Sequence, residues 1–531
     1  MLDNHPPSPG DAVNPVLPGF HPDPSACRVD GPDGTWYYAV NSSFEYLPGL
    51  PVHRSRDLVE WELVGHAIHR PGQLDLSSVG DSQGLFAPTI RHDGERFLVV
   101  CTLVGEAPRA GNFIVTATDA AGPWTDPVWW EGGGIDPSLF FDTDGRVWAQ
   151  GTRPAPEPEW DQQTQVWVRE LHPDTLQLMG EEHIVWTGAV RGAVWAESPH
   201  LYRRGDHVYL LASEGGTNFH HAVSVARGDS PTGPFEGCAG NPVFSHRHLG
   251  RDHPVANAGH ADLVEDPDGR WWAVLLATRP VEGIDVLGRE TFLVPVAWED
   301  DWPVFAPGRG MLVANPDRPR ARTGDRAVAT RAAAATVGVR QFPEDLGQLA
   351  DDRITMAAGP GLDAPEPAYV GRRLTRIPAT LSVTLDDVPE TAAAGLALRY
   401  SSAVWGAVMA SPTLTGTRLS ILATLDGEQV TIADHVVAGP VTGTIRLGVD
   451  GLRAHASWTT STGQVHQLGE LSLAAMGAVA SGGFVGTTYG LHCTGSGVVS
   501  AHGLGLGDLM GVTVGRRDAG AELLRVGRGQ A

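Results

Sequence analysis

Short runs of apolar residues, separated by glycine-containing turns, recur along roughly the first 300 residues of the chain. Five segments share one pattern: a small or polar cluster, an apolar strand, an Asp-Gly or Gly-Asp turn, and a second strand rich in Val, Trp, Tyr or Leu. Asp-Gly between two apolar runs predicts a β-hairpin. No long stretch keeps the 3.6-residue period of an amphipathic helix, so hairpins are expected throughout this region. The segments begin at His21, Phe86, Ile135, Ala196 and Gly259.

The spacing of these segments predicts how the hairpins assemble. Their polar clusters follow one another at intervals of 49 to 64 residues, and a propeller blade of four strands takes about 40–60 residues. Five such units predict a five-bladed β-propeller. Equivalent positions in the blades lie at the same radius, so we expect the cluster side chains to point into one axial pocket. They are Asp23, Asp136, Glu197 and His260, with Phe86 and Ala87 at the matching place in the second blade.

The pattern changes at Trp302 and indicates a second domain. Residues 315–338 are rich in Arg, Ala and Pro, which is typical of a linker. The strands beyond it alternate apolar and polar residues with a period of two, which predicts an antiparallel β-sandwich. The predicted all-β chain comprises an N-terminal tail (1–13), a propeller (14–314), a linker (315–338), a β-sandwich (339–510) and a C-terminal tail (511–531).

The charge and composition of the chain exclude some classes of binding partner. The chain carries 62 acidic and 38 basic residues, a formal net charge of −24, which repels phosphate backbones and anionic lipid. Neither nucleic acid nor membrane partners are therefore expected. The four cysteines have no metal-ligand spacing, Cys27 and Cys101 are expected to be buried apolar residues, and the first 13 residues lack a secretory signal pattern. These features predict a cytoplasmic location.

The converging acids suggest acid–base chemistry, because titratable groups gathered in one cavity shift each other's pKa values. A single Asp before Pro-Ser is more often a turn residue, but the matching places of Asp23 and Asp136 in the repeat favour a functional role. Glu197 belongs to the same set. For His260, a structural role and a role in ion or substrate binding both remain open.

The sequence motifs resemble those of glycoside hydrolase family 43, especially its two-domain β-xylosidases and α-L-arabinofuranosidases. The resemblance runs closely from Asn14 to Phe305 and more weakly through the C-terminal domain, where VGRRLT and GGFVGTTYGLHCTG carry it. The closely matching motifs are NPVLPGFHPDPS, SSFEYLPGLPVHRSRDLVEW, GGGIDPSLFFD, AESPHLY, EGGTNFHHAVSVARG, NAGHADLVEDPDGRWWAV and LGRETFLVPVAWEDDWPV.

This resemblance implies a role for each acid. Asp23 of HPDPS matches the general base, Asp136 of GIDPS matches the residue that orients the acid and tunes its pKa, and Glu197 of WAESPH matches the general acid. Inverting glycosidases hold the acid and the base about 6.5–9.5 Å apart, with room for a water molecule between them. We therefore predict this separation for Asp23 and Glu197.

The resemblance also implies which residues bind substrate. They are Phe44 as an aromatic wall, Phe86 in the second blade, His260 near the pocket floor and Arg289 on substrate hydroxyls. The alternative for Arg289 is a surface ion pair, and Trp195 is interpreted as a core aromatic. Two departures bear on pocket shape and on the preferred sugar: Ser198 stands where the family usually has glycine, and Phe86 where it often has tryptophan.

The function implied is that of an inverting exo-glycosidase that removes terminal β-1,4-xylose, α-L-arabinofuranose or both from xylo- or arabino-oligosaccharides. The alternatives are an endo-arabinanase, which needs an open groove, and a non-catalytic carbohydrate-binding propeller. In the two-domain members that the chain resembles, the sandwich helps to close the site, and Phe484 of GGFVG lies in the segment that is similar to the one approaching the pocket there. No organic cofactor is expected; a hydrated Ca²⁺ ion in the axial channel near His260 and a homo-oligomeric state are further expectations.

Overall fold

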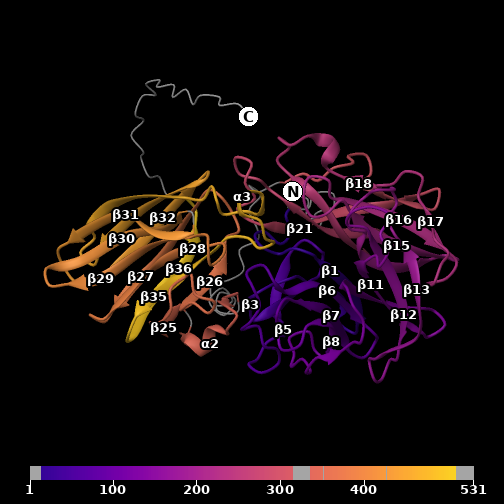
Figure 1. The fold of residues 1–531 in the computed structure, drawn as a ribbon, viewed down its shortest axis with the longest axis horizontal. Coiled ribbons are helices and arrows are strands. Elements are labelled where there is room, and N and C mark those ends of the chain that lie inside the picture. Colours follow the sequence, from indigo (N-terminus) through magenta and orange to yellow (C-terminus); the bar gives the residue numbers. More distant parts are fainter. Residues whose placement is uncertain (1–13, 315–334, 351, 426, 510–531) are drawn as a thin grey trace, which may run out of the picture.

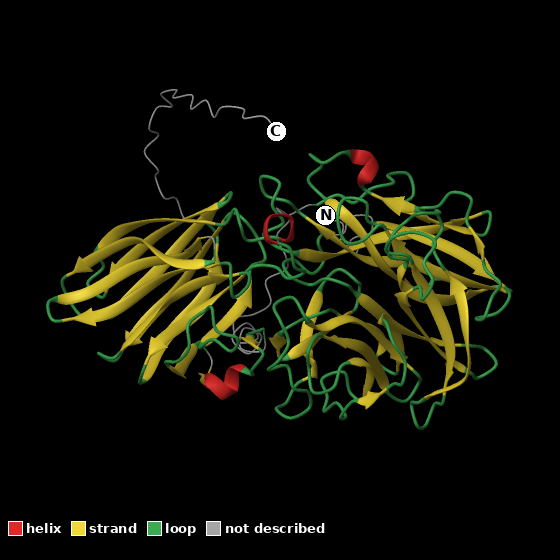
Figure 2. Cartoon of the chain, in the orientation of Figure 1, coloured by secondary structure: helices red, strands yellow, loops and turns green. Residues whose placement is uncertain are grey.

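The computed structural model describes residues 14–314, 335–350, 352–425 and 427–509. Two bodies built almost entirely of strands lie side by side, with the N-terminal domain in indigo to pink and the C-terminal domain in orange to yellow (Figure 1). The helical segments in these ranges are short, as Figure 2 shows, and comprise η2 (Arg247–Leu249), α2 (Pro343–Leu346) and α3 (Ala478–Ser481). The tails predicted at 1–13 and 511–531 and most of the predicted linker lie outside the described residues.

The N-terminal domain is a five-bladed propeller, as predicted, in which each blade is a sheet of consecutive antiparallel strands. The first blade comprises β1 (Ser25–Gly31), β2 (Gly34–Val40), β4 (Gly49–Ser55) and β5 (Trp61–Ile68). The second comprises β6 (Gly84–His92), β7 (Phe97–Val104), β8 (Gly111–Ala117) and β9 (Val128–Trp129). The third comprises β10 (Ile135–Phe141), β11 (Val147–Pro154), β12 (Thr164–Leu171) and β13 (Leu178–Trp186).

The fourth and fifth blades continue the same order. The fourth comprises β14 (Glu197–Arg204), β15 (His207–Glu214), β16 (Ala222–Gly228) and β17 (Glu236–Gly237), and β18 (Phe244–Ser245) also pairs with β16. The fifth comprises β19 (Ala256–Glu265), β20 (Trp271–Thr278), β21 (Arg289–Glu299) and β22 (Trp302–Phe305). Each junction between neighbouring blades has its own apolar core, so burial between blades holds the ring together.

The segment before β1 closes the ring by joining the first blade to the fifth. Asn14 exchanges two hydrogen bonds of 2.8 Å with the backbone of Leu293 on β21. Leu17 pairs with Thr291, and the backbone N–H of His21 donates to the carbonyl of Arg289 at 3.1 Å. This pairing sets the start of β1 directly beside the start of β21.

A buried ion pair ties the inner strands of four blades together. Asp262 on β19 accepts hydrogen bonds from both terminal nitrogens of Arg91 on β6, at 2.8 and 3.0 Å. The same carboxylate accepts from Ser25 on β1 at 2.6 Å and from Tyr202 on β14 at 2.5 Å. Because every oxygen of the buried carboxylate has a partner, this network fixes the inner strands relative to one another.

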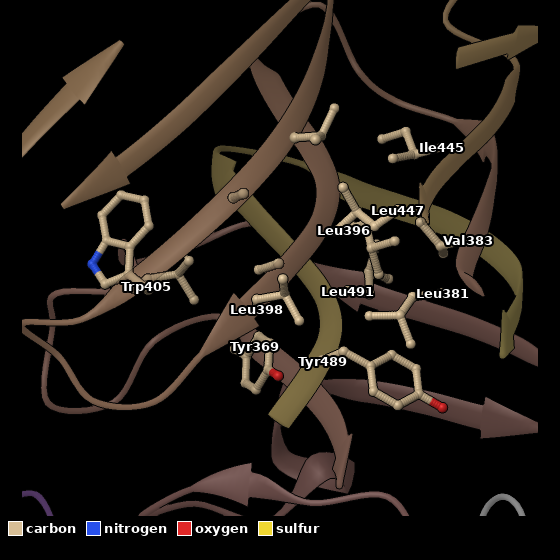
Figure 3. Packing of buried hydrophobic residues seen from close by; sticks show 14 of the residues in the cluster. Tyr369, Leu381, Val383, Leu396, Leu398, Trp405, Ile445, Leu447, Tyr489 and Leu491 are labelled. Atoms are coloured by element: carbon tan, nitrogen blue, oxygen red, sulfur yellow. The ribbon is translucent and has the colours of Figure 1, made fainter. Parts of the chain in front are cut away.

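The C-terminal domain is an antiparallel β-sandwich, also as predicted. One sheet has the order β24 (Gly347–Ala350), β25 (Arg353–Ala357), β36 (Val498–Gly507), β27 (Ala379–Asp387), β32 (Gly443–Asp450), β33 (Arg453–Thr460) and β34 (Val465–Ser472). The other has the order β26 (Tyr369–Arg373), β35 (Thr488–Gly495), β28 (Ala392–Arg399), β29 (Trp405–Thr413), β30 (Gly416–Leu425) and β31 (Glu428–Val437). Inward-facing side chains of both sheets, such as Leu396 and Leu447, form the shared core (Figure 3).

The two domains meet at a short sheet and at a partly buried charge cluster. The sheet pairs β3 (Tyr46–Leu47) of the propeller with β23 (Gly338–Val339). Beside it, Asp81 of the propeller accepts hydrogen bonds from Arg340 at 2.9 Å and from Arg399 of the sandwich at 3.3 Å. These hydrogen bonds fix the loop that contains Asp81 and Ser82, and Ser82 lines the cavity described below.

Candidate active site

The inner strand of every blade has a residue with left-handed backbone geometry just before its start or within its first five residues, and these residues define the true repeat. Their φ angles lie between 39° and 54°, and the residues are Asp23, Ala87, Asp136, Ser198 and His260. The predicted equivalence of Glu197 with Asp23 and Asp136 was therefore wrong by one residue. Ser198 takes the repeat position, and Glu197 precedes it. The repeat is set by backbone geometry at the strand start, which the polar side chains alone did not reveal.

The strand starts open onto one cavity of about 670 Å³, a volume typical of ligand sites. Asp23, Asp136 and Glu197 line it together, although they lie in the first, third and fourth blades. Each is at most 7% exposed. The structure thus brings the three predicted catalytic acids into one largely buried site, with Phe86, His260 and Arg289 also on its wall.

Asp23 is held in its ionised form. Arg289 Nη1 donates a hydrogen bond to Asp23 Oδ1 at 2.7 Å, and Ser42 Oγ donates to Oδ2 at 2.6 Å. Burial by itself would raise the pKa of Asp23, but Arg289, His260 and the Ser42 hydroxyl outweigh it and lower that pKa below its usual value. Asp23 is therefore a carboxylate at neutral pH.

The surroundings of Glu197 favour its protonated form, in contrast to those of Asp23. Burial raises its pKa well above the usual value, and the neighbouring carboxylates of Asp136 and Asp23 raise it further. Burial and then Asp23 also raise the pKa of Asp136, to about 7. Asp136 Oδ2 accepts the backbone N–H of Ser198 at 2.9 Å, which favours its ionised form. Of the two, Asp136 gives up its proton first, and Glu197 holds its proton more strongly.

His260 lies next to Asp23 but is neutral. Burial lowers its pKa to about 4, although Asp23, 3.7 Å from its Nδ1, opposes that shift. Its backbone N–H donates to Ser213 Oγ at 2.6 Å. His260 thus lines the cavity as an uncharged imidazole beside the ionised base.

An aromatic cluster forms the side of the cavity nearest the sandwich. Phe86 of β6 and Phe484 of the sandwich both line the cavity, with ring centroids 5.8 Å apart. Arg289 Nη2 donates to the carbonyl of Phe484 at 3.3 Å, and the backbone N–H of Phe484 donates to Ser82 Oγ at 3.0 Å. Phe44, predicted as an aromatic wall, is fully buried and lies behind these rings, with its centroid 4.7 Å from that of Phe86.

Sequence reasoning missed three contributors to the site. Ser42 donates to Asp23 and also accepts the backbone N–H of Ala87 at 2.7 Å; its position in SSFE was the available signal. Trp195, interpreted from sequence as a core residue, instead lines the cavity together with Gln162. Gln162 offered no signal, because it reaches the site from a loop of the third blade.

The described residues contain no group of three or more His, Cys, Asp or Glu side chains arranged to hold a metal ion. Asp262, the other acid near the axis, is occupied by Arg91. The residues around His260 therefore do not form the oxygen cage that Ca²⁺ usually takes.

Two carboxyl groups that share one cavity, one with a raised and one with a lowered pKa, are the acid and the base that cleavage of a glycosidic bond requires. Fold and site together define the class of protein as a β-propeller glycoside hydrolase.

Comparison with known proteins identifies the family. Residues 12–303 match glycosyl hydrolases family 43, and residues 347–502 match the beta xylosidase C-terminal concanavalin A-like domain. The chain belongs to glycosyl hydrolases family 43, in a two-domain form, as its motifs indicated.

Individual relatives agree with this assignment. A xylosidase/arabinosidase of Butyrivibrio fibrisolvens is 49% identical over 306 residues, which is 57% of this chain and 57% of that protein. A non-reducing end alpha-L-arabinofuranosidase of Bacteroides ovatus is 33% identical over 91% of both chains. Among solved structures, the family 43 protein BlXynB of Bacillus licheniformis is 28% identical, with a TM-score of 0.80 over 92% of this chain and 98% of that one. The match to the Butyrivibrio protein thus spans just over half its length.

Proposed function

We propose that this chain is an inverting exo-glycosidase that removes terminal β-1,4-xylose, α-L-arabinofuranose or both from xylo- or arabino-oligosaccharides. One observation carries the proposal: Asp23 and Glu197 share a cavity, and their surroundings shift their pKa values in opposite directions. An acid and a base of this kind are what hydrolysis with inversion needs.

In the proposed mechanism, Asp23 takes a proton from a water molecule on one face of the terminal sugar, and that water attacks the anomeric carbon. Glu197 donates its proton to the glycosidic oxygen as the bond to the leaving sugar breaks. The hydrogen bonds from Arg289 and Ser42 leave Asp23 ionised and fix its orientation. A separation of about 6.5–9.5 Å between the Asp23 and Glu197 carboxyl groups stays a prediction of this mechanism.

In the proposed mechanism, Asp136 acts on the pKa of Glu197 and does not itself react with the sugar. Its negative charge raises the pKa of Glu197, so that the acid is still protonated at neutral pH. The hydrogen bond from the Ser198 N–H holds the Asp136 carboxylate in place, and this N–H belongs to the residue that follows Glu197. Acid and modulator are therefore positioned by the same turn.

Exo-action is supported by the sandwich, because Phe484 and Arg289 join the two domains across one side of the cavity. A long polysaccharide needs a groove that is open on both sides, as in the alternative of an endo-arabinanase. The names of the relatives support the choice of sugars, since one is a xylosidase/arabinosidase and another a non-reducing end alpha-L-arabinofuranosidase. Phe86 and Ser198, where the chain departs from its family's usual residues, are the positions to examine for the preference between them.

The test is a kinetic panel with p-nitrophenyl β-D-xyloside and p-nitrophenyl α-L-arabinofuranoside, followed by NMR of the first product formed. We expect hydrolysis of at least one glycoside, with the anomeric configuration inverted. Retention of configuration would exclude the proposed roles of Asp23 and Glu197. Oligosaccharide binding without any turnover would favour the non-catalytic alternative, and cleavage within long arabinan would favour the endo-arabinanase.

The proposed reaction needs no organic cofactor, and the side chains around His260 do not supply a cage for Ca²⁺. The hydrated Ca²⁺ ion expected there would therefore be held mainly by water. We predict that exhaustive dialysis against EDTA leaves kcat and KM unchanged, because both catalytic groups are carboxyls that act without a metal. Metal analysis of the untreated protein tests the ion itself, and a loss of activity that added Ca²⁺ restores would contradict the prediction.

The proposed function includes a cellular location and an oligomeric state for the enzyme. We propose that the enzyme works in the cytoplasm on imported oligosaccharides, which is supported by four free cysteines that a reducing compartment keeps as thiols. None of the helices in the described ranges has the length and apolar character needed to cross a membrane. A homo-oligomeric state remains part of the prediction, and light scattering of the purified protein tests it.

A further inference from the structure

The cavity has two chemically different sides. Asp23, Arg289 and Phe484 lie on one side, joined by the hydrogen bonds of Arg289. The other side belongs to the third and fourth blades and carries Trp195 and Gln162. The first side holds the proposed base, which is buried, and receives Phe484 of the sandwich, which is 38% exposed. On the second side, Trp195 is half-buried and Gln162 is exposed.

Trp195 is held in position at two points by one neighbour. Its backbone N–H donates to the carbonyl of Gln162 at 3.2 Å, and its indole Nε1 donates to Gln162 Oε1 at 2.9 Å. Both residues have left-handed backbone geometry, with φ of 54° for Trp195 and 58° for Gln162. Side chains with a Cβ adopt this geometry at a cost, and such strain gathers at ligand-binding sites. The protein thus maintains a fixed, partly exposed indole at the cavity wall.

The position of Glu197 indicates what this indole faces. Glu197 follows Trp195 by two residues at the start of β14, and both line the cavity. A general acid must touch the glycosidic oxygen, so the departing sugar lies on the Glu197 side of the bond. On the opposite side, Arg289 and the sandwich occupy the wall. The departing sugar therefore leaves past the third and fourth blades, where Trp195 stands.

We infer that Trp195, oriented by Gln162, is the platform for the leaving-group sugar, and this inference rests on the proposed function. A sugar ring has an apolar C–H face that packs on an aromatic ring and a polar edge that needs hydrogen bonds. The cavity wall beside Trp195 supplies such partners in Thr217, Asn218 and Arg153. Arg153 is itself fixed by a two-point ion pair with Glu182.

The test compares substrates that differ only in the leaving group. We expect Trp195→Ala to lower kcat/KM for β-1,4-xylobiose by at least about 10-fold, the scale of losing one buried aromatic contact. Hydrolysis of β-xylosyl fluoride, whose leaving group is too small to reach the platform, should stay within about 2-fold of wild type. α-1,5-Arabinobiose and α-arabinofuranosyl fluoride give the same comparison for arabinose. Trp195→Phe should recover most of the disaccharide activity, because it restores a planar ring.

A matched control is Trp160, which lies in the same loop as Gln162 and donates its indole N–H to the Ala193 carbonyl at 2.9 Å. Trp160→Ala should not change the ratio of disaccharide to fluoride activity, because this tryptophan is not on the cavity wall. Equal losses on both substrates in Trp195→Ala, or no loss on either, would overturn the inference. Failure of the wild-type enzyme on every disaccharide and fluoride would instead overturn the proposed function.

Discussion

Three carboxyl groups of similar intrinsic acidity behave differently here because each side chain meets different neighbours. Asp23 receives hydrogen bonds from Arg289 and Ser42, whereas Glu197 is buried next to two other acids. Asp136 lies between these extremes, with a pKa raised to about 7. At the scale of the residue, the environment alone divides the roles of base, modulator and acid.

Removing the acid should matter most for poor leaving groups. We expect Glu197→Ala to lower kcat on xylobiose by about 10²–10⁴-fold, because general acid catalysis contributes on that scale. The loss should be much smaller on 2,4-dinitrophenyl xyloside, whose leaving group departs without a proton. Steady-state kinetics on both substrates checks this, and equal losses on the two would argue against Glu197 as the acid.

The pH profile should report the same division. Activity should rise as pH passes the lowered pKa of Asp23, since the base must be ionised, and fall when Glu197 loses its proton at higher pH. In Asp136→Asn the negative neighbour of Glu197 is gone, so the alkaline limb should move to lower pH by roughly 1 unit. Measurement of kcat/KM against pH tests the shift, and an unmoved or higher alkaline limb would exclude Asp136 as the modulator.

At the scale of the element, the inner strand of each blade does two tasks. A residue near its start turns into the cavity through left-handed geometry, and the residues that follow pack the blades against each other. On β19, His260 faces Asp23 while Asp262, two residues later, binds Arg91 of β6. One strand therefore contributes to both the site and the closure of the ring.

Breaking the Asp262–Arg91 pair should destabilise the whole propeller. We expect Asp262→Asn to lower the free energy of unfolding by about 3–5 kcal/mol, because it leaves a buried guanidinium without its counter-charge. Burial opposes ionisation of Asp262, but Arg91 and His200 lower its pKa far below the usual value, so wild type should lose this stabilisation only in strong acid. Urea unfolding at several pH values tests both points. A stability loss below about 1 kcal/mol would contradict the structural role.

At the scale of the whole molecule, the sandwich takes part in the site rather than being a passive appendage. Asp81 accepts hydrogen bonds from Arg340 and Arg399, and the neighbouring Ser82 accepts a hydrogen bond from the backbone N–H of Phe484. The second domain is thus fixed against the propeller at the place where it supplies an aromatic ring to the cavity. The complete substrate site exists only when both domains are folded and docked.

Removing the ring that the sandwich supplies should weaken substrate binding more than the chemical step. We expect Phe484→Ala to raise KM about 10-fold with a smaller change in kcat. The ring contributes apolar contact area to the cavity but carries no group that could transfer a proton. Kinetics on the preferred p-nitrophenyl glycoside measures the two constants separately. A large fall in kcat at unchanged KM would contradict this division of roles.

The sequence by itself determined the blades, the sandwich and the three acids, because strand period and turn residues are local and the hairpins repeat at a regular interval. The sequence analysis assigned the repeat position of the fourth blade to Glu197, whereas it belongs to Ser198. The polarity of a side chain does not reveal the left-handed backbone geometry that marks this position.

Only the tertiary structure decided what surrounds the acids. The neighbours of Asp23 include Arg289, 266 positions away, and Phe484 reaches Arg289 across 195 positions. The same holds for Trp195, whose indole is anchored by Gln162 on another loop. Charge state and access depend on such long-range contacts, since burial and neighbouring charges set a pKa, and no local pattern of residues encodes them.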